Sequence, residues 1–207
     1  MSLYNEDFRN LKGYIWAKDV IEGRFLANKY VKLECQRYVD RLERLQYEDD
    51  FPFTFSMKEA EIVFGLTRLM NFPTGFFANE PIYDKLHGFQ AMVIENVFCW
   101  FSKEPDENGI VNKMIEEVYL EVGRKSSKSF ICSLLEVLIM LRSARFAQHG
   151  LGGKTRDISS IVKQATVELI KASPLIAKYF KITNSQITCL INECTLKAFS
   201  GEFRLVI

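Results

Sequence analysis

Apolar residues in the first half of the chain recur mostly three or four positions apart, which is the spacing of one helix face. Over 24–45 they are interleaved with basic residues, and this pattern predicts a long amphipathic helix. A shorter helix is predicted over 56–69, because Ser56 and Glu59 form the pattern of a capping box. A further helix, mostly buried, is predicted over 87–101. The front of the chain is therefore expected to be helical.

The second half alternates between strand-like and helix-like segments. A short apolar stretch over 117–122 predicts a strand, and the polar loop after it leads into a buried helix predicted over 128–143. The three glycines between positions 150 and 153 predict a flexible connection.

The last part of the chain is expected to contain one long helix and two strands. The helix is predicted over 157–179, with an interruption at Ser173-Pro174. Segments rich in Ile, Leu, Cys, Thr and Phe predict strands over 186–191 and 195–199. Strand, loop, helix, long helix and strand together predict an α/β fold with a partial βαβ core.

The clearest turn in the sequence sets the expected domain boundary. It lies at 105–109, where Pro, Glu, Asn and Gly occur together. The predicted organisation is a helical N-terminal region over 1–110, followed by an α/β core over 111–207.

The composition is that of a globular protein. With 207 residues and a hydrophobic content of 48%, the chain can bury a substantial core. Its most apolar run, over 130–141, contains Glu136 and is shorter than the roughly 18–20 residues that cross a bilayer. The N-terminus lacks the basic and apolar regions of a secretory signal. We therefore expect no membrane segment and an intracellular location.

Cysteine and histidine give no sign of a metal centre. The cysteines stand at positions 35, 99, 132, 189 and 194, without any C-x-x-C spacing. Their odd number and scattered positions argue against disulfides and against zinc, so buried free thiols are expected. His87 and His149 are too isolated to predict a metal site or a catalytic triad, and structural roles are expected for both.

Charge is distributed unevenly, although the net charge is only +1. Residues 1–110 carry 13 basic and 18 acidic side chains, a net charge of −5, whereas residues 111–207 carry 14 basic and 8 acidic ones, a net charge of +6. A basic half suits a polyanionic ligand such as a nucleotide or DNA. Lysines on a solvated surface explain the same count, and both interpretations stay open.

The candidate chemistry is concentrated in the loop Gly123-Arg-Lys-Ser-Ser-Lys-Ser129, between the predicted strand and the buried helix. This is the layout of a phosphate-binding loop, in which backbone N–H groups cradle phosphate, a lysine contacts its charge and a hydroxyl binds Mg²⁺. The usual pattern G-x-x-x-x-G-K-[ST] has glycines where this chain has Val122 and Ser127. A serine at 127 is expected to cost about 1 kcal/mol if its φ is positive.

Motifs along most of the chain resemble, in their order, the large terminase subunit of tailed bacteriophages. The residues that carry the resemblance are Tyr14, Val20, Gly23, the segments 31–37 and 40–43, Gly75, Pro81, Leu86, Phe89-Gln90, Trp100, the segments 119–129 and 155–157, Ser173-Pro174 and the segment 195–202. The loop is similar to that family's own variant of the phosphate loop, in which Arg and Lys occupy positions that are arbitrary in other ATPases.

The resemblance implies a P-loop NTPase core over 111–207 and a role for each loop residue. Lys128 would contact the β- and γ-phosphates of ATP, and Ser129 would bind Mg²⁺. Backbone N–H groups would come from Gly123, Arg124, Lys125, Ser126 and Ser127. Arg124 would act as a cis arginine finger, which makes it the candidate catalytic residue.

The same resemblance implies an adenine site and a set of partners. Gln90 would read the adenine edge and Phe89 would stack on the base, which favours ATP over GTP. The implied protein is a DNA-packaging motor that uses ATP and Mg²⁺ in the cytoplasm of the bacterial host. It would act on double-stranded viral DNA with the small terminase subunit and the portal protein, as a homo-oligomeric ring.

Each of these roles has a structural alternative. Lys128 and Ser129 also fit a charged helix start, and Arg124 fits a surface ion pair. Gln90 fits an amide on a helix surface. The basic residues over 24–45 fit a solvated face as well as a contact with DNA or a neighbouring subunit.

The sequence stops at Ile207, before the apolar run ending in Asp-Glu that holds Mg²⁺ and activates water in such ATPases. The nuclease domain of full-length terminases is also absent. We therefore expect a fragment whose parent hydrolyses ATP and cuts DNA, while the fragment alone does neither. A non-catalytic terminase relative that acts as a protein-binding module, and a helicase-like P-loop ATPase, are the alternatives.

Overall fold

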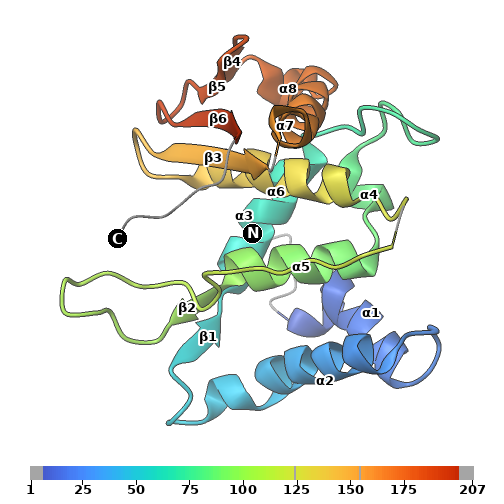
Figure 1. Ribbon diagram of the computed structural model, residues 1–207. Coiled ribbons are helices and arrows are strands. Elements are labelled where there is room, and N and C mark those ends of the chain that lie inside the picture. Colours follow the sequence, from blue (N-terminus) through green and yellow to red (C-terminus); the bar gives the residue numbers. More distant parts are fainter. Residues whose placement is uncertain (1–6, 124, 154, 201–207) are drawn as a thin grey trace. The chain divides into compact units, whose positions relative to one another are not determined.

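The computed structural model describes residues 7–123, 125–153 and 155–200 (Figure 1). It is a mixed α/β fold, and the chain divides into two compact units. The first unit comprises Met1–Phe64 and Leu86–Leu120, and the second comprises Gly65–Lys85 and Glu121–Ile207. The boundary expected at residue 110 falls inside the first unit.

The first unit is mainly helical. Its elements are η1 (Phe8–Asn10), α1 (Lys12–Ile21), α2 (Lys29–Glu43), η2 (Leu45–Tyr47), β1 (Phe53–Phe55), most of α3 (Met57–Arg68), α5 (Gly88–Cys99) and β2 (Trp100–Ser102). Helix α1 packs against both α2 and α5. Strands β1 and β2 pair antiparallel, with Phe55 opposite Trp100.

Two glycines allow α1 and α5 to lie close together. A Cβ on Gly13 would lie 1.9 Å from Glu95 Oε2 and 2.6 Å from Met92 Cα. A Cβ on Gly88 would lie 2.1 Å from Trp16 Cβ. Because atoms in a close-packed interior do not approach one another this closely, only glycine fits at these two positions.

Glu95 is a fully buried carboxyl at the centre of this packing. Its Oε1 accepts the Gly13 N–H at 3.1 Å, and its Oε2 accepts the Tyr38 hydroxyl of α2. Burial raises the pKa of Glu95 to about 7, against the opposing effect of the two hydrogen bonds. Burial, together with Glu95, also raises the pKa of Tyr38. The Glu95 carboxyl of α5 therefore links this helix to α1 and α2.

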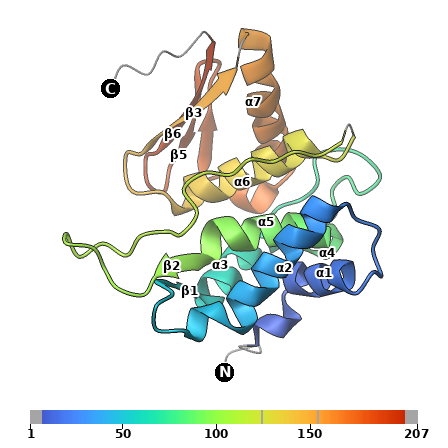
Figure 2. The same ribbon diagram turned by 60° about the horizontal axis from the view of Figure 1, so that its bottom comes forward.

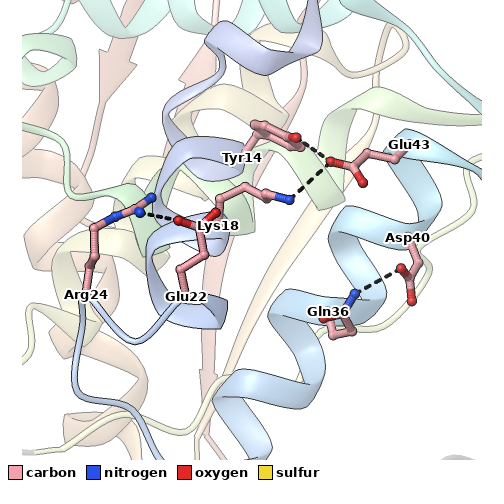
Figure 3. Close-up of polar contacts among 7 residues, drawn as sticks. All are labelled: Tyr14, Lys18, Glu22, Arg24, Gln36, Asp40 and Glu43. Atoms are coloured by element: carbon pink, nitrogen blue, oxygen red, sulfur yellow. Dashed lines mark hydrogen bonds and ion pairs between the residues drawn. The ribbon is translucent and has the colours of Figure 1, made fainter.

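A second polar contact joins α1 to α2 nearer the surface (Figure 3). Glu43 accepts a hydrogen bond from Tyr14 and another from Lys18, the latter at 3.5 Å. In the turn after α1, Arg24 pairs with Glu22. Exposed pairs of this kind contribute only about 0–1 kcal/mol each, so the buried contacts dominate the packing.

Helix α2 is amphipathic over its second half only. Its buried residues are Cys35, Tyr38, Val39 and Leu42. Tyr30 and Leu33 continue the apolar spacing toward the N-terminus, but they are 69% and 49% exposed. The helix predicted over 24–45 is therefore confirmed for Lys29–Glu43, with apolar residues left on the surface of its first turns.

The second unit combines a small sheet with two main helices. Its elements are α4 (Ile82–Lys85), α6 (Lys128–Arg142), β3 (Gln148–Gly153), α7 (Arg156–Lys171), α8 (Pro174–Ala177), β4 (Phe180–Ile182), β5 (Gln186–Cys189) and β6 (Thr195–Ser200). The strand order is β3-β6-β5-β4, and β3 pairs parallel with β6 while the other pairs are antiparallel. Helix α7 packs on β3 and β6 and also contacts α6 (Figure 2).

Most of the locally encoded predictions are confirmed. Helix α3 begins after Ser56, whose hydroxyl accepts the Glu59 N–H at 3.2 Å, as the capping pattern predicts. Helix α5 ends at Cys99, two residues before the predicted end, and α6 begins at Lys128 as predicted. The predicted interruption at Ser173 separates α7 from α8, and β5 and β6 are the two predicted strands.

Two predictions are wrong. The segment 117–122 is not a strand, because no described strand pairs with it and its apolar side chains are not covered: Tyr119 is 89% exposed and Val118 50%. The glycines of 150–153 are not a flexible connection, because they belong to β3 and pair with β6. A βαβ core with a strand directly before the loop is therefore also wrong, and the parallel pair is β3 with β6.

No helix within 7–123, 125–153 or 155–200 is both long enough and apolar enough to span a membrane. The five cysteines are free thiols, and all except Cys132 are buried.

Candidate functional site

The loop before α6 lies in the second unit and is open to solvent. Its exposed residues are Gly123, Lys125 and Ser127, together with the first helical residues Lys128 and Ser129, while Ser126 is half-buried. Arg124, the candidate arginine finger, lies outside the described residues. The structure thus brings the lysine, the hydroxyl and a tight turn together in one short segment.

The sign of the backbone angle φ changes from residue to residue in this loop. Lys125 has φ 64° and Ser127 has φ 58° and ψ 31°, both in the left-handed region, whereas Ser126 between them does not have a positive φ. Successive residues of opposite hand turn their N–H groups toward a common side, although here the Ser126 N–H already donates to the Gly123 carbonyl at 3.3 Å. The positive φ that the glycine of the usual pattern accommodates is therefore present at Ser127.

The start of α6 provides further N–H donors directly after this turn. Ser127 is the N-cap residue but makes no side-chain cap hydrogen bond, and the first turn contains no acidic residue. The first N–H groups of a helix have no partner within the helix, and they carry the positive end of the helix dipole. An anion placed here would find donors that the described side chains leave unoccupied.

Helix α6 holds the loop against the body of the second unit. Its buried residues are Ile131, Ser133, Leu134, Val137, Leu138 and Met140. Phe130, directly after Ser129, stacks on Phe72 with ring centroids 4.9 Å apart and an angle of 20° between the planes. The exposed lysine and hydroxyl therefore stand on a firmly packed helix.

The two residues predicted to hold the adenine lie in α5 of the first unit. Gln90 is only 3% exposed, and its side-chain oxygen accepts the His87 N–H at 3.0 Å. The Phe89 ring lies 6.2 Å from the rings of both Trp16 and His87, centroid to centroid. Both side chains already have partners within their own unit.

Ser129 is the residue of this loop that is predicted to bind Mg²⁺. No group of three or more His, Cys, Asp or Glu side chains suited to a metal occurs in the described parts of the chain. Ser129 supplies a single hydroxyl, which is the contribution that a phosphate loop makes to Mg²⁺ while the phosphates supply other ligands.

A second polar cluster, which the sequence analysis missed, lies at the other end of α6. Ser143 Oγ is 2.9 Å from His149 Nε2, and His149 Nδ1 is 3.8 Å from Glu136 Oε1. Burial raises the pKa of Glu136 to about 7 and lowers the pKa of His149. Glu136 and Ser143 stand two helical turns apart on one face, and this spacing was the only local signal of the cluster.

The direction of the hydrogen bonds indicates that this cluster has a structural role and that Ser143 is not arranged as a nucleophile. The Ser143 hydroxyl donates its proton to the Ile139 carbonyl at 2.7 Å, so His149 Nε2 donates to Ser143 Oγ. In a serine nucleophile the histidine accepts that proton instead. The structural role expected for His149 therefore fits its contacts, which tie the end of α6 to β3.

Comparison with protein-family models, with curated proteins and with solved structures gives no significant match.

Proposed function

We propose that this chain binds ATP with Mg²⁺ through the loop before α6, as the N-terminal part of the ATPase domain of a phage terminase large subunit. The observation that carries the proposal is the left-handed backbone of Ser127 directly before Lys128. A lysine and a hydroxyl that follow such a turn, at the start of a buried helix, are the arrangement that phosphate binding requires.

In this proposal the side chains of the loop supply charge and a metal ligand, and its backbone supplies hydrogen-bond donors. The Lys128 ammonium contacts the β- and γ-phosphates, and the Ser129 hydroxyl binds Mg²⁺. The N–H groups of Lys125 and of residues 127–129 surround the β-phosphate, where the helix dipole favours negative charge, while the Ser126 N–H donates to the Gly123 carbonyl. Arg124 stabilises charge on the γ-phosphate as a cis arginine finger.

The proposed parent protein is a P-loop ATPase that packages double-stranded viral DNA with a small terminase subunit and a portal protein, as a ring of identical subunits. The excess of basic residues over 111–207, 14 against 8 acidic ones, supports a polyanionic ligand for this half of the chain.

The decisive experiment is calorimetry of ATP binding in the presence of Mg²⁺. Lys128→Ala is expected to abolish measurable binding, because it removes the charge that contacts the phosphates. Lys171→Ala is the matched control, since this exposed lysine lies at the last residue of α7 and is expected to leave binding unchanged. Equal ATP affinity in the wild type and in Lys128→Ala would falsify the phosphate-loop assignment.

A second candidate function is a non-catalytic protein-binding module. It is favoured by the apolar surface before and along the start of α2, where Phe25 is 52%, Leu26 105% and Tyr30 69% exposed. Leu26→Asp is expected to weaken the binding of a partner protein and to leave ATP binding unchanged. If the partner binds equally well to the variant, this surface has no such role.

A further inference from the structure

The segment between α3 and α4 is a loop held in place by backbone hydrogen bonds. Asn71 and Pro81 form an antiparallel bridge at its neck. Just inside the neck, the Phe72 N–H donates to the Glu80 carbonyl at 3.0 Å. At its base, the Asn71 N–H donates to Ser173 Oγ at 2.9 Å. The loop therefore presents its side chains from a fixed backbone.

Aromatic side chains of this loop form a row that begins at α6. Phe72 stacks on Phe130, and the Phe77 ring lies 6.0 Å from the Phe72 ring. Phe76 lies 5.2 Å from Phe77 in an edge-to-face arrangement. Because Phe130 directly follows Ser129, the row starts one residue beyond the candidate phosphate loop.

The outer end of the row is open to solvent. Phe76 is 94% exposed, so its ring gives up nearly all of the favourable free energy that burial would provide. Phe77 is better covered, since the Lys85 ammonium lies 5.1 Å from its ring centroid and is itself held by Glu80 at 3.3 Å. A loop with a fixed backbone and one exposed ring, linked by ring contacts to the residue after Ser129, has the form of a stacking platform.

We propose that Phe76 is the platform on which the base of the bound nucleotide stacks, with its phosphates on the loop before α6. This inference rests on the proposed function and adds the base-side contact to it. Base stacking uses the ring face alone, so the ligand class is a nucleoside triphosphate with either purine. Phe72 and Phe130 act as positioning residues that hold the platform beside the loop.

The contacts of Phe89 support this assignment over the one that the family resemblance implies. The Phe89 ring is half-buried and already lies beside the rings of Trp16 and His87. The oxygen of Gln90 is already occupied by a backbone N–H. Phe76, in contrast, has a ring face that a base can cover without displacing any protein contact.

The test compares the binding of two ligands by calorimetry: Mg²⁺-ATP, and Mg²⁺-tripolyphosphate, which has the phosphates without the base. Phe76→Ala is expected to weaken ATP binding roughly 5- to 100-fold, the loss of one aromatic stack, and to leave tripolyphosphate binding unchanged. Phe146→Ala is the control, because this residue is 61% exposed but follows the opposite end of the 15-residue α6. It is expected to bind both ligands as the wild type does.

The outcomes separate the two proposals. If both ligands bind and Phe76→Ala binds ATP as tightly as the wild type, the platform is overturned while the phosphate loop stands, and the exposed ring is left as a contact for a protein partner. If the wild type binds neither ligand, both proposals fail. Phe76→Trp supplies a direct readout, since ATP is expected to quench the fluorescence of the added indole and tripolyphosphate is not. Equal quenching by both ligands contradicts stacking.

Discussion

Backbone N–H groups differ in their surroundings between two regions of the molecule. One region is the α1–α5 packing of the first unit, and the other is the loop before α6 in the second unit. In the first, the Gly13 N–H is buried and donates to Glu95. In the second, Ser127 and the first residues of α6 are exposed, and Ser127 makes no side-chain cap hydrogen bond. A buried polar group without a partner costs about 1–3 kcal/mol, whereas an exposed one is satisfied by water.

This difference separates a structural contact from a binding site. Glu95 cannot be exchanged for a ligand, because its removal leaves the buried Gly13 N–H and Tyr38 hydroxyl without an acceptor. In the proposed function, the loop exchanges water for phosphate without breaking a contact inside the protein. The comparison also explains why glycine is required at 13 but only favourable at 127: the first position lacks space for a Cβ, and the second has a strained φ.

The largest expected effect comes from filling the space at Gly13. Gly13→Ala is predicted to lower the free energy of unfolding by about 3 kcal/mol or more, because the new Cβ overlaps Glu95 and the backbone of Met92. Both tryptophans, Trp16 and Trp100, lie in the first unit, so their fluorescence during urea unfolding is the measurement.

Gly65→Ala is the control for this variant. Gly65 lies within α3, at the start of the second unit, and a Cβ there meets nothing within 4 Å, so no loss of the fluorescence-detected stability is expected. Similar losses in both variants would show that the close packing at Gly13 is not what the substitution disrupts.

The next effect is a pH dependence that originates at Glu95. Its pKa is raised from 4.5 to about 7, so the folded state holds its proton where the unfolded state has lost it. The stabilisation is complete below pH 4.5 and is lost as the pH rises through about 7, with a total of about 3 kcal/mol.

Urea unfolding followed by tryptophan fluorescence between pH 4 and 8 measures this loss, and Glu95→Gln is expected to remove it. Glu136 of the second unit, whose pKa is also raised to about 7, has the same sign. Glu136→Gln is the matched control, since it is expected to leave the fluorescence-detected dependence in place. An unchanged pH profile in Glu95→Gln would refute the role of this carboxyl.

A smaller effect on stability is expected at Ser173, a buried residue of the second unit whose hydroxyl is hydrogen-bonded. Its hydroxyl donates to the Leu169 carbonyl at 2.7 Å and accepts the Asn71 N–H at 2.9 Å. Ser173→Ala is predicted to cost about 1–3 kcal/mol and to speed hydrogen exchange at the Asn71 amide. Ser185→Ala, at an exposed hydroxyl, is expected to change stability by less than about 0.5 kcal/mol. Equal exchange at Asn71 in all three proteins would contradict the anchoring role.

The smallest effect is expected in the loop itself. Ser127→Gly is predicted to raise stability by at most about 1 kcal/mol, since it relieves a left-handed φ but adds freedom to the unfolded chain. Ser126→Gly is the matched control, because φ is not positive there and a loss of about 0.5–1 kcal/mol is expected. Thermal unfolding followed by far-ultraviolet circular dichroism measures both. A loss of stability in Ser127→Gly equal to that in Ser126→Gly would contradict the alternating backbone.

Features encoded by neighbouring residues could be predicted from the sequence. Ser56 caps α3 because the hydroxyl and the Glu59 N–H are three residues apart, and α6 begins at Lys128 because the loop residues before it favour a turn. Ser127 also has the positive φ under which a serine at this position is expected to cost about 1 kcal/mol. These features depend on chemistry within a few residues.

Features that depend on distant partners could not be predicted. A short apolar stretch such as 117–122 occurs both in paired strands and in exposed irregular segments, and only the absence of a neighbouring strand among the described residues distinguishes them. The glycines of 150–153 become a strand only through their pairing with β6. Nothing near Phe72 in the sequence indicates that its ring stacks on Phe130.

The strand order of the second unit has a consequence for how the chain folds as it is synthesised. Strand β6 lies inside the sheet and pairs with both β3 and β5, yet it is the last of the four to leave the ribosome. Strand β3 therefore cannot pair until Thr195–Ser200 has been synthesised, more than forty residues later. Until then α7 lacks β6, one of the two strands on which it packs, so this unit is expected to fold late and as a whole.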